Sequence, residues 1–403
     1  MPNRIINKAL PFFSTILFAV SACDDTITFS NTPPAGLSIT RDICYLATNK
    51  SVTLTGNAAD PDGDPITFSW TANAGVFDPA DGTGRVVSWR SPSVPGTYRV
   101  VLTVSDGIDE ATKGIDIEVG PRVVVSLGEI VLDQTELPYF IEQTSPLLIG
   151  SITTLRVGPG VTVIVSDAGG GLSIEGTMIV EGTAGERVTF RPNSCPGQQG
   201  RWQGISFAGD QARGTLSHVY MARAETAIRV ENGASVDCTG LYLEHCGGDA
   251  IAVIDSGTVS IDASRIWNNA HGIKVENGIM HITGSSVREN GTYGFFLVSN
   301  SYGGPFEALI TACVVAANDG DGFILSQYAN PVINGNSIFF NQTQAGTGFA
   351  IRLQAYSGDR AIDATGNYWG VDNEADILEQ LFIGPAAAEI DYSGWLSEPP
   401  VHF

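Results

Sequence analysis

Three acidic residues in the middle of the chain have the type and spacing that could bind a cation or transfer a proton. Glu231, Asp255 and Glu276 each follow a short apolar run, and Arg229 and Lys274 lie close by. Carboxylates in a row can bind Ca²⁺, and an adjacent arginine or lysine can serve as a base. These five residues are the candidate catalytic set. Their alternative role is that of solvated charges on the outer face of a sheet.

Aromatic residues form a second candidate set, for binding rather than for catalysis. Trp202, Tyr242 and Trp267 recur through the same part of the chain, where strand alternation directs some side chains outward. Aromatic faces can stack against sugar rings, so these three are the candidate binding residues. The alternative is that they fill the corners or ends of a core.

A third group of acids lies nearer the N-terminus. Asp60, Asp62 and Asp64 alternate along the chain, as the ligands of calcium loops do. Such a loop also requires a glycine after the third acid and a glutamate at its end, but Gly63 precedes Asp64 and Thr71 takes the last position. The spacing therefore favours a tight turn with solvated carboxylates. Ca²⁺ is the one cofactor that these residues suggest.

The elements that must position the first two sets repeat with a period of about 22 residues. The blocks 227–246, 250–269 and 272–290 each contain three short alternating segments bounded by Gly or Asn. One such repeat cannot bury its apolar faces alone, so the repeats are predicted to stack as coils, with parallel strands about 4.8 Å apart. Eight to nine coils would form a rod about 40 Å long.

Stacking predicts which residues point inward. One aliphatic ladder is expected from Ile228, Ile251, Ile273 and Phe295, and a second from Cys238, Ile261 and Ile282. The asparagines that end successive repeats should stack at one corner, where left-handed backbone geometry and side-chain amide bonds suit them. Cys246 takes the place of an asparagine in this series, and the period lengthens at an inserted loop, 302–305.

The flanks of the repeats carry a family resemblance. The segments 155–163, 202–207 and 366–370 resemble the opening, recurrent and closing segments of bacterial right-handed parallel β-helices of the pectate-lyase-like class. The resemblance covers about 121–403 and implies a β-helix with capped ends, a fold that enzymes and non-enzymes share. Ala270–Lys274 resembles a fragment of a polysaccharide hydrolase site, but the paired aspartates of that site are missing here. His271 is therefore expected to be an exposed turn residue.

A separate domain precedes the β-helix. Alternating segments such as 66–70 and 98–104 are separated by Asp-Gly and Pro-Gly turns, which indicates a β-sandwich. The segment Asp60–Trp70 and the later 96–107 resemble strands of PKD-like and cadherin-like Ig modules. The resemblance covers 39–120 and implies a spacer or a contact domain of an exported protein.

The N-terminus resembles a bacterial lipoprotein signal peptide. Arg4 and Lys8 precede an apolar run too short to span a bilayer comfortably, and the run ends in a lipobox-like Val20–Cys23. Cys23 is the expected lipidation site, with ordinary secretory cleavage as the alternative. A Pro-containing tether follows over 24–38. The residue after Cys23 is Asp24, and an acid at this position is compatible with a final location in either membrane.

Composition limits the partners. The chain has 403 residues, with 43 acidic against 21 basic residues and a net charge of −22, so nucleic acid is not an expected partner. Apart from Cys23 five cysteines remain, an odd number, of which Cys238–Cys246 or Cys195–Cys246 could pair. No cysteine pair has zinc-ligand spacing.

The sequence thus predicts an all-β protein, an Ig-like sandwich followed by a right-handed parallel β-helix, exported and lipid-anchored at the cell surface. Its β-helix is expected to be a rigid, non-catalytic platform that binds polysaccharide or a surface protein. The alternatives are a polysaccharide lyase or glycoside hydrolase acting on the exposed sheet, and a structural or adhesive rod.

Overall fold

The structure is a computed structural model that describes residues 30–167, 169–195, 199–341, 348–384 and 388–400. The expected signal peptide, Cys23 and the first part of the tether lie outside the described residues. No helix within the described ranges is long and apolar enough to cross a bilayer.

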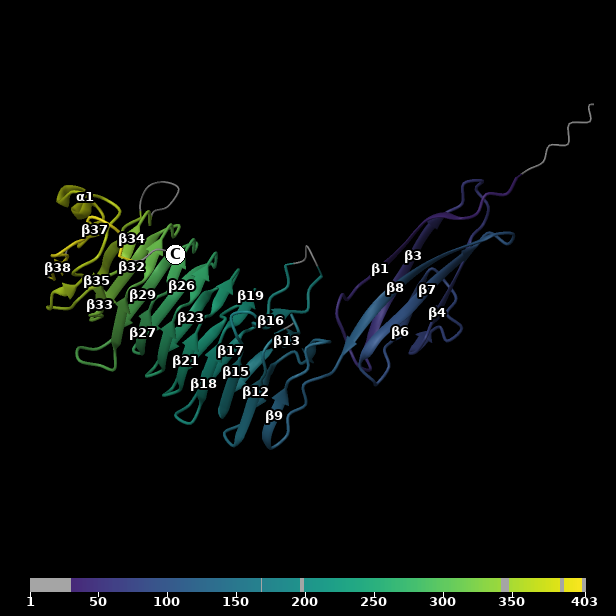
Figure 1. Cartoon of the computed structure of the whole chain (residues 1–403), viewed down its shortest axis with the longest axis horizontal. Coiled ribbons are helices and arrows are strands. Elements are labelled where there is room, and N and C mark those ends of the chain that lie inside the picture. Colours follow the sequence, from purple (N-terminus) through teal and green to yellow (C-terminus); the bar gives the residue numbers. More distant parts are fainter. Residues whose placement is uncertain (1–29, 168, 196–198, 342–347, 385–387, 401–403) are drawn as a thin grey trace, which may run out of the picture.

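The first domain is a sandwich of two four-stranded sheets (Figure 1). The first sheet comprises, in spatial order, β1 (Ala35–Arg41), β3 (Ser51–Ala59), β6 (Val86–Arg90) and β5 (Val76–Asp78). The second comprises β2 (Leu46–Ala47), β8 (Glu110–Gly120), β7 (Gly96–Ser105) and β4 (Thr67–Ala72).

Strand alternation builds the sandwich core. Leu54 of β3, Trp70 of β4 and Leu102 of β7 are buried between the sheets, while their sequence neighbours are at least partly exposed. The domain begins at Ala35, within the segment expected to be a tether. The chain is already fixed before β1, because the side chain of Asn31 donates to Asp106 and Asp109.

The second domain is a parallel β-helix of three sheets. The nine-stranded sheet comprises β10 (Tyr139–Ile141), β13 (Thr162–Val165), β16 (Val188–Pro192), β19 (Val219–Ala222), β22 (Tyr242–Glu244), β25 (Arg265–Trp267), β28 (Ser286–Arg288), β31 (Val314–Ala316) and β34 (Ser337–Phe339). The ten-stranded sheet comprises β11 (Pro146–Ile149), β14 (Gly171–Ile174), β17 (Ile205–Ala208), β20 (Ile228–Glu231), β23 (Asp249–Ile254), β26 (His271–Glu276), β29 (Tyr293–Ser299), β32 (Asp321–Gln327), β35 (Ile351–Tyr356) and β37 (Leu381–Phe382). The eleven-stranded sheet comprises β9 (Gly128–Leu132), β12 (Thr153–Val157), β15 (Thr177–Glu181), β18 (Arg213–Ser217), β21 (Ser235–Thr239), β24 (Thr258–Asp262), β27 (Ile279–Thr283), β30 (Glu307–Thr311), β33 (Val332–Asn334), β36 (Ile362–Asp363) and β38 (Ile390–Asp391).

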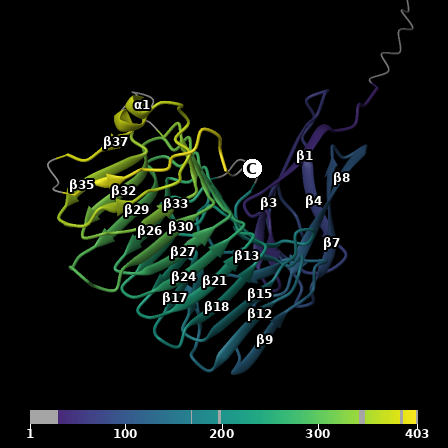
Figure 2. The same cartoon turned by 60° about the vertical axis from the view of Figure 1, so that its left-hand side comes forward.

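Each coil contributes one strand to each sheet, and the strands pair in parallel with the coils before and after (Figures 1 and 2). The coils begin at β9, upstream of the clear sequence repeats, so the array is longer than the eight to nine coils expected. The first coils were missed because their connections differ in length, which hides the period.

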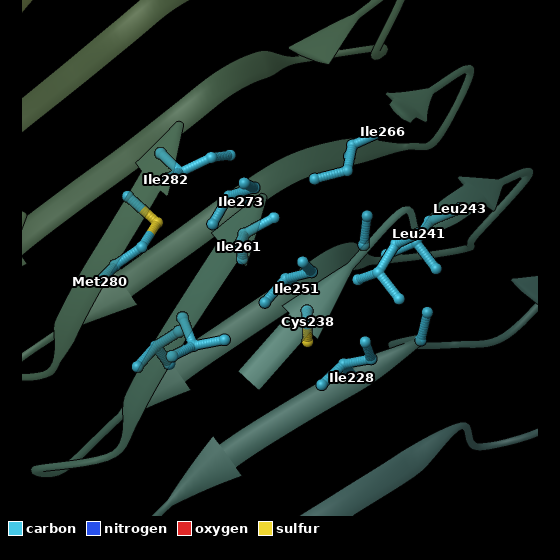
Figure 3. Packing of buried hydrophobic residues seen from close by; sticks show 14 of the residues in the cluster. Ile228, Cys238, Leu241, Leu243, Ile251, Ile261, Ile266, Ile273, Met280 and Ile282 are labelled. Atoms are coloured by element: carbon cyan, nitrogen blue, oxygen red, sulfur yellow. The ribbon is translucent and has the colours of Figure 1, made fainter. Parts of the chain in front are cut away.

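Both predicted aliphatic ladders are confirmed. Ile228, Ile251, Ile273 and Phe295 are partners in register and fully buried. Figure 3 shows the first three in line, and beside them the second ladder of Cys238, Ile261 and Ile282. Burial of these side chains is possible only when neighbouring coils cover them, so the ladders hold the coils together.

The predicted asparagine stack is confirmed, with one correction. The side-chain oxygen of each asparagine accepts the backbone N–H and the side-chain N–H of the asparagine one coil earlier, along Asn269, Asn290, Asn318 and Asn341. Cys246 joins this stack through its backbone N–H, which donates to Asn269. The left-handed residue, however, is the one before each asparagine, such as Asn268 (φ 55°). A second stack, which the sequence analysis missed, includes Asn336 and Asn367.

A disulfide joins the two domains. Cys44 of the sandwich pairs with Cys195 of the β-helix, so both expected bridges to Cys246 are wrong, and Cys238, Cys246 and Cys313 are buried free thiols. Figure 2 places the sandwich beside the first coils. There the backbone oxygen of Tyr45 accepts from Asn193, and the guanidinium of Arg191 lies 4.1 Å from the centre of the Tyr45 ring. Ion pairs join Glu142 of the β-helix to Lys50 and Arg122.

The C-terminal end of the β-helix is closed by α1 (Glu374–Glu379) and the aromatic residues around it. Asn373 caps α1 by accepting the backbone N–H of Asp376. Ile377 and Trp369 are buried, and Trp395 packs on the same core. Trp369 and Trp395 therefore help to close the C-terminal end, as the resemblance to capped β-helices implies.

Candidate functional site

The outer face of the nine-stranded sheet carries two rows of side chains that run along the rod. In the first row Tyr220 of β19 is in register with Tyr242 of β22, and Tyr242 is in register with Arg265 of β25. In the second row Trp267 of β25 faces Arg288 of β28. Because successive coils are about 4.8 Å apart, the rows place aromatic and cationic groups at regular intervals.

The aromatic side chains of these rows touch one another. The ring centres of Tyr220 and Tyr242 are 5.8 Å apart, and those of Tyr242 and Trp267 are 5.9 Å apart in an edge-on arrangement. The guanidinium of Arg187 lies 5.9 Å from the centre of the Tyr242 ring. All three rings are half-buried, so each keeps an accessible part while its neighbours hold its orientation.

A pocket of about 210 Å³ is lined by residues of both rows. Its walls include Tyr242 and Trp267, together with Arg265, Arg288 and Glu289. Arg265 and Glu289 are exposed, so charged groups surround the rim while the aromatic residues form the apolar wall. We call this site the aromatic–arginine pocket. It has two cations against one acid, although the chain as a whole has a net charge of −22.

Two buried hydrogen-bond donors of this pocket have no protein acceptor. They are the indole Nε1–H of Trp267 and the Nε–H of Arg288. Buried donors are nearly always paired, and exceptions are often met by water or a ligand. An oxygen-rich molecule in the pocket would supply acceptors for such donors. Next to the pocket Glu244 already accepts the hydroxyl of Tyr220 at 2.5 Å, and burial, followed by this bond, raises the pKa of that tyrosine.

The structure brings together two of the three predicted binding residues. Tyr242 and Trp267 share the pocket, but Trp202 is fully buried, stacks on Phe190 and donates its indole N–H to the backbone of Ala222. The binding role expected for Trp202 is therefore wrong. Strand alternation does not predict the direction of this side chain, because Trp202 lies before β17, in a corner where a side chain can turn into the core.

The predicted catalytic set is divided into two ion pairs. Arg229 pairs with Glu231 on β20, and Lys274 pairs with Glu276 on β26. These strands are separated by β23, whose residue in register with both acids is Ile254.

Asp255 therefore does not lie in the row expected for it. It follows the strand in a turn with a left-handed φ of 46°. For Glu276, the hydrogen bonds from Lys274 and from the side chain of Asn300 hold the pKa below its usual value. The geometry thus gives Glu231 and Glu276 each a cation on its own strand and brings the three acids together in no shared cation site. Their catalytic role stays a prediction.

The acids of the sandwich form the tight turn favoured by the sequence. Asp60 Oδ1 accepts the backbone N–H groups of Asp62 and Asp64, and Asp62 accepts that of Thr32. Asp60 Oδ2 is buried without a protein partner. Calcium binding by this turn stays the less favoured alternative. Over the described ranges, no group of three or more His, Cys, Asp or Glu residues is arranged to hold a metal ion.

One cluster at a corner of the coils was not predicted from the sequence. Asp249, His271 and Tyr293 begin three successive strands, and Asp249 Oδ1 accepts the hydroxyl of Tyr293 at 2.5 Å and lies 3.2 Å from Nδ1 of His271. The two rings stack with centres 5.0 Å apart. His271 is thus a partnered corner residue rather than a free turn residue. Each of the three residues lies two positions before a member of the first aliphatic ladder, and this equal spacing was the signal available in the sequence.

Comparison with protein families supports both domains. Residues 36–119 match the family model of the PKD domain, and residues 170–308 match that of the right handed beta helix region. No curated protein sequence matches the chain.

Three solved structures share limited similarity with the chain. A nucleoside hydrolase-related hypothetical protein from Saccharophagus degradans, associated with carbohydrate metabolism, is 17% identical with a TM-score of 0.18, over 23% of this chain and 26% of that protein. This chain thus spans about a quarter of that protein. The ZirS C-terminal domain is 19% identical with a TM-score of 0.17, over 30% of this chain and 87% of that domain. The family 28 exopolygalacturonase of Yersinia enterocolitica is 9% identical with a TM-score of 0.30, over 92% of this chain and 98% of that enzyme.

Proposed function

We propose that this chain, a PKD domain joined to a right-handed parallel β-helix, is an exported surface protein that binds a glycan on the outer face of its nine-stranded sheet. The aromatic–arginine pocket is the centre of the binding site. The rest of the β-helix is the rigid support that fixes its geometry, and the PKD domain is the spacer between the pocket and the membrane.

The observation that carries this proposal is the combination of groups in one pocket. Tyr242 and Trp267 offer apolar faces for the C–H side of a sugar ring, while Arg265 and Arg288 offer N–H donors to its hydroxyl or carboxylate oxygens. A binding site for a small molecule needs this mixture of apolar walls and a few placed polar groups.

The coil spacing favours an extended glycan over a single sugar. Tyr220, Tyr242 and Trp267 lie on three successive coils, with ring centres 5.8 and 5.9 Å apart. One sugar unit of an extended chain is similar in length to one coil. A glycan that lies along the rod would therefore meet one aromatic ring per sugar, and the arginines favour a chain that carries carboxylates.

Export and lipid anchoring are part of the proposal. The lipobox-like segment that ends at Cys23 supports them, and so does the disulfide between Cys44 and Cys195, because such bonds persist mainly in oxidising compartments. A lipid at Cys23 would leave the sandwich between the membrane and the β-helix.

A glycan array with neutral and uronic acid-containing polysaccharides tests the binding function. We expect the protein to bind at least one extended glycan, and Trp267→Ala to weaken that binding about tenfold, because one aromatic stack contributes about 1.4 kcal/mol. Phe340→Ala is the matched control, since Phe340 is 70% exposed and lies outside the pocket. Equal binding by the wild type and Trp267→Ala would contradict the assignment of the site.

The arginines give an independent readout. Arg288→Gln should weaken binding of a uronic acid-containing glycan more than binding of a neutral one, and added salt should reduce this difference. Arg213→Gln on the eleven-stranded sheet is the control, because Arg213 is exposed on another face of the coil. Lyase or hydrolase products released from the bound glycan would show that the protein is an enzyme as well as a binding platform.

A further inference from the structure

Longer connections gather at one corner of the coils. Most turns from the ten-stranded to the eleven-stranded sheet are short, such as Asn277 and Gly278 between β26 and β27. The connections 300–306, 328–331 and 357–361, on three successive coils, are longer. Insertions in coiled repeats form loops on the surface, often at a binding face. This corner lies opposite the nine-stranded sheet, so it is separate from the aromatic–arginine pocket.

The three loops enclose a cavity of about 140 Å³. We call it the corner pocket. Its walls include four aromatic residues, Tyr302, Phe306, Tyr328 and Tyr356, beside small and polar ones. The acid Asp359 and the base Arg360 also line it. The rings of Tyr302 and Tyr328 meet edge-on with centres 6.0 Å apart, and the guanidinium of Arg360 lies 5.7 Å from the centre of Tyr302.

Backbone hydrogen bonds hold these loops in place without a ligand. The N–H of Tyr328 donates to Ser299, and the N–H groups of Ser357 and Gly358 both donate to Gln327. At position 358 a Cβ atom would lie 2.5 Å from the hydroxyl of Tyr356, so a larger residue there would displace that ring. The pocket is therefore formed in advance, which reduces the entropy lost on binding.

One polar group of the pocket lacks a partner. The hydroxyl of Tyr356 is buried and has no hydrogen bond. Burial, and then the charge of Asp359, raises the pKa of Tyr356 to about 12, so the hydroxyl stays protonated at neutral pH and available as a donor. Asp359 adds an acceptor and Arg360 adds further donors, with charges that cancel.

We propose that the corner pocket is a second carbohydrate site, which binds one ring of a neutral sugar. Aromatic walls suit the C–H face of the ring, and the donor and acceptor groups suit its hydroxyls. The volume is below the range of about 300–1,000 Å³ typical of drug-sized ligands, so the pocket fits one terminal ring rather than a chain. The proposal does not depend on glycan binding at the aromatic–arginine pocket.

Ligand-observed NMR with the methyl glycosides of glucose, galactose, mannose and N-acetylglucosamine tests this proposal. We expect at least one glycoside to receive saturation from the protein. Tyr302→Ala should weaken that binding about tenfold, since it removes one aromatic wall. Tyr356→Phe should weaken it less, since it removes only the hydroxyl. Phe340→Ala, at an exposed aromatic residue outside the pocket, should bind as the wild type does.

Two results would overturn the proposal. One is that none of the four glycosides binds. The other is that Tyr302→Ala binds normally while Trp267→Ala does not, because the sugar would then occupy the aromatic–arginine pocket. Circular dichroism of each variant confirms that a loss of binding is not a loss of fold.

Discussion

Replacing Asn318 by alanine tests whether the buried asparagine stack holds the coils together. The side chain of Asn318 donates to the backbone oxygen of Val287 at 3.2 Å and to Asn341 at 2.8 Å. It accepts the backbone and side-chain N–H groups of Asn290 at 3.1 and 2.9 Å. Alanine removes all four bonds. At about 1 kcal/mol for each net bond, we expect the free energy of unfolding to fall by about 4 kcal/mol.

Urea denaturation followed by circular dichroism measures this loss. Asn300→Ala is the matched control, because Asn300 is exposed and its side chain makes one hydrogen bond, to Glu276. The control should lose about 0.5 kcal/mol. If Asn318→Ala lost no more free energy of unfolding than Asn300→Ala, the asparagine stack would not stabilise the coils.

Three further predictions concern cysteines and pH. The buried thiols should resist iodoacetamide in the native protein and react after unfolding, as peptide mapping would show. The reason is that burial raises the pKa of Cys246 and of Cys313 to about 12, and raises that of Cys238 as well. Rapid labelling of the native protein would contradict this prediction. Cys44→Ser should lower the free energy of unfolding by about 2–4 kcal/mol in urea, because the disulfide closes a loop of 151 residues; an unchanged midpoint would refute it. Glu276→Gln should cost under about 1 kcal/mol at pH 7, and this cost should shrink as the pH falls below 4.5, the ordinary pKa of the carboxyl, because a carboxyl with a lowered pKa stabilises the fold only while it is ionised; a cost independent of pH would exclude this mechanism.

The repeat predicted the core of the β-helix because burial there follows strict alternation. Ile251 and Ile273 had to lie in one ladder once the coils were aligned, and the structure pairs them. The asparagine stack followed from the same alignment. Its left-handed residue was placed one position too late, because the sequence does not show whether the turn begins at Asn268 or at Asn269.

The functional surface was less predictable because side-chain direction in a corner does not follow alternation. Trp202 and Trp267 look alike in sequence, yet the first is buried and the second lines a pocket. Asp255 likewise lies one residue beyond Ile254, the residue that is in register with Glu231 and Glu276. The disulfide could not be predicted at all, because residues 151 positions apart carry no local signal of their contact.

The most direct test of the binding function is a crystal structure of the protein with the glycan that binds most tightly on the array. We expect glycan density along β22, β25 and β28, with sugar rings against Tyr242 and Trp267 and oxygen atoms within hydrogen-bond distance of Arg288. Density for the glycan on another face of the coil, with this pocket empty, would contradict it.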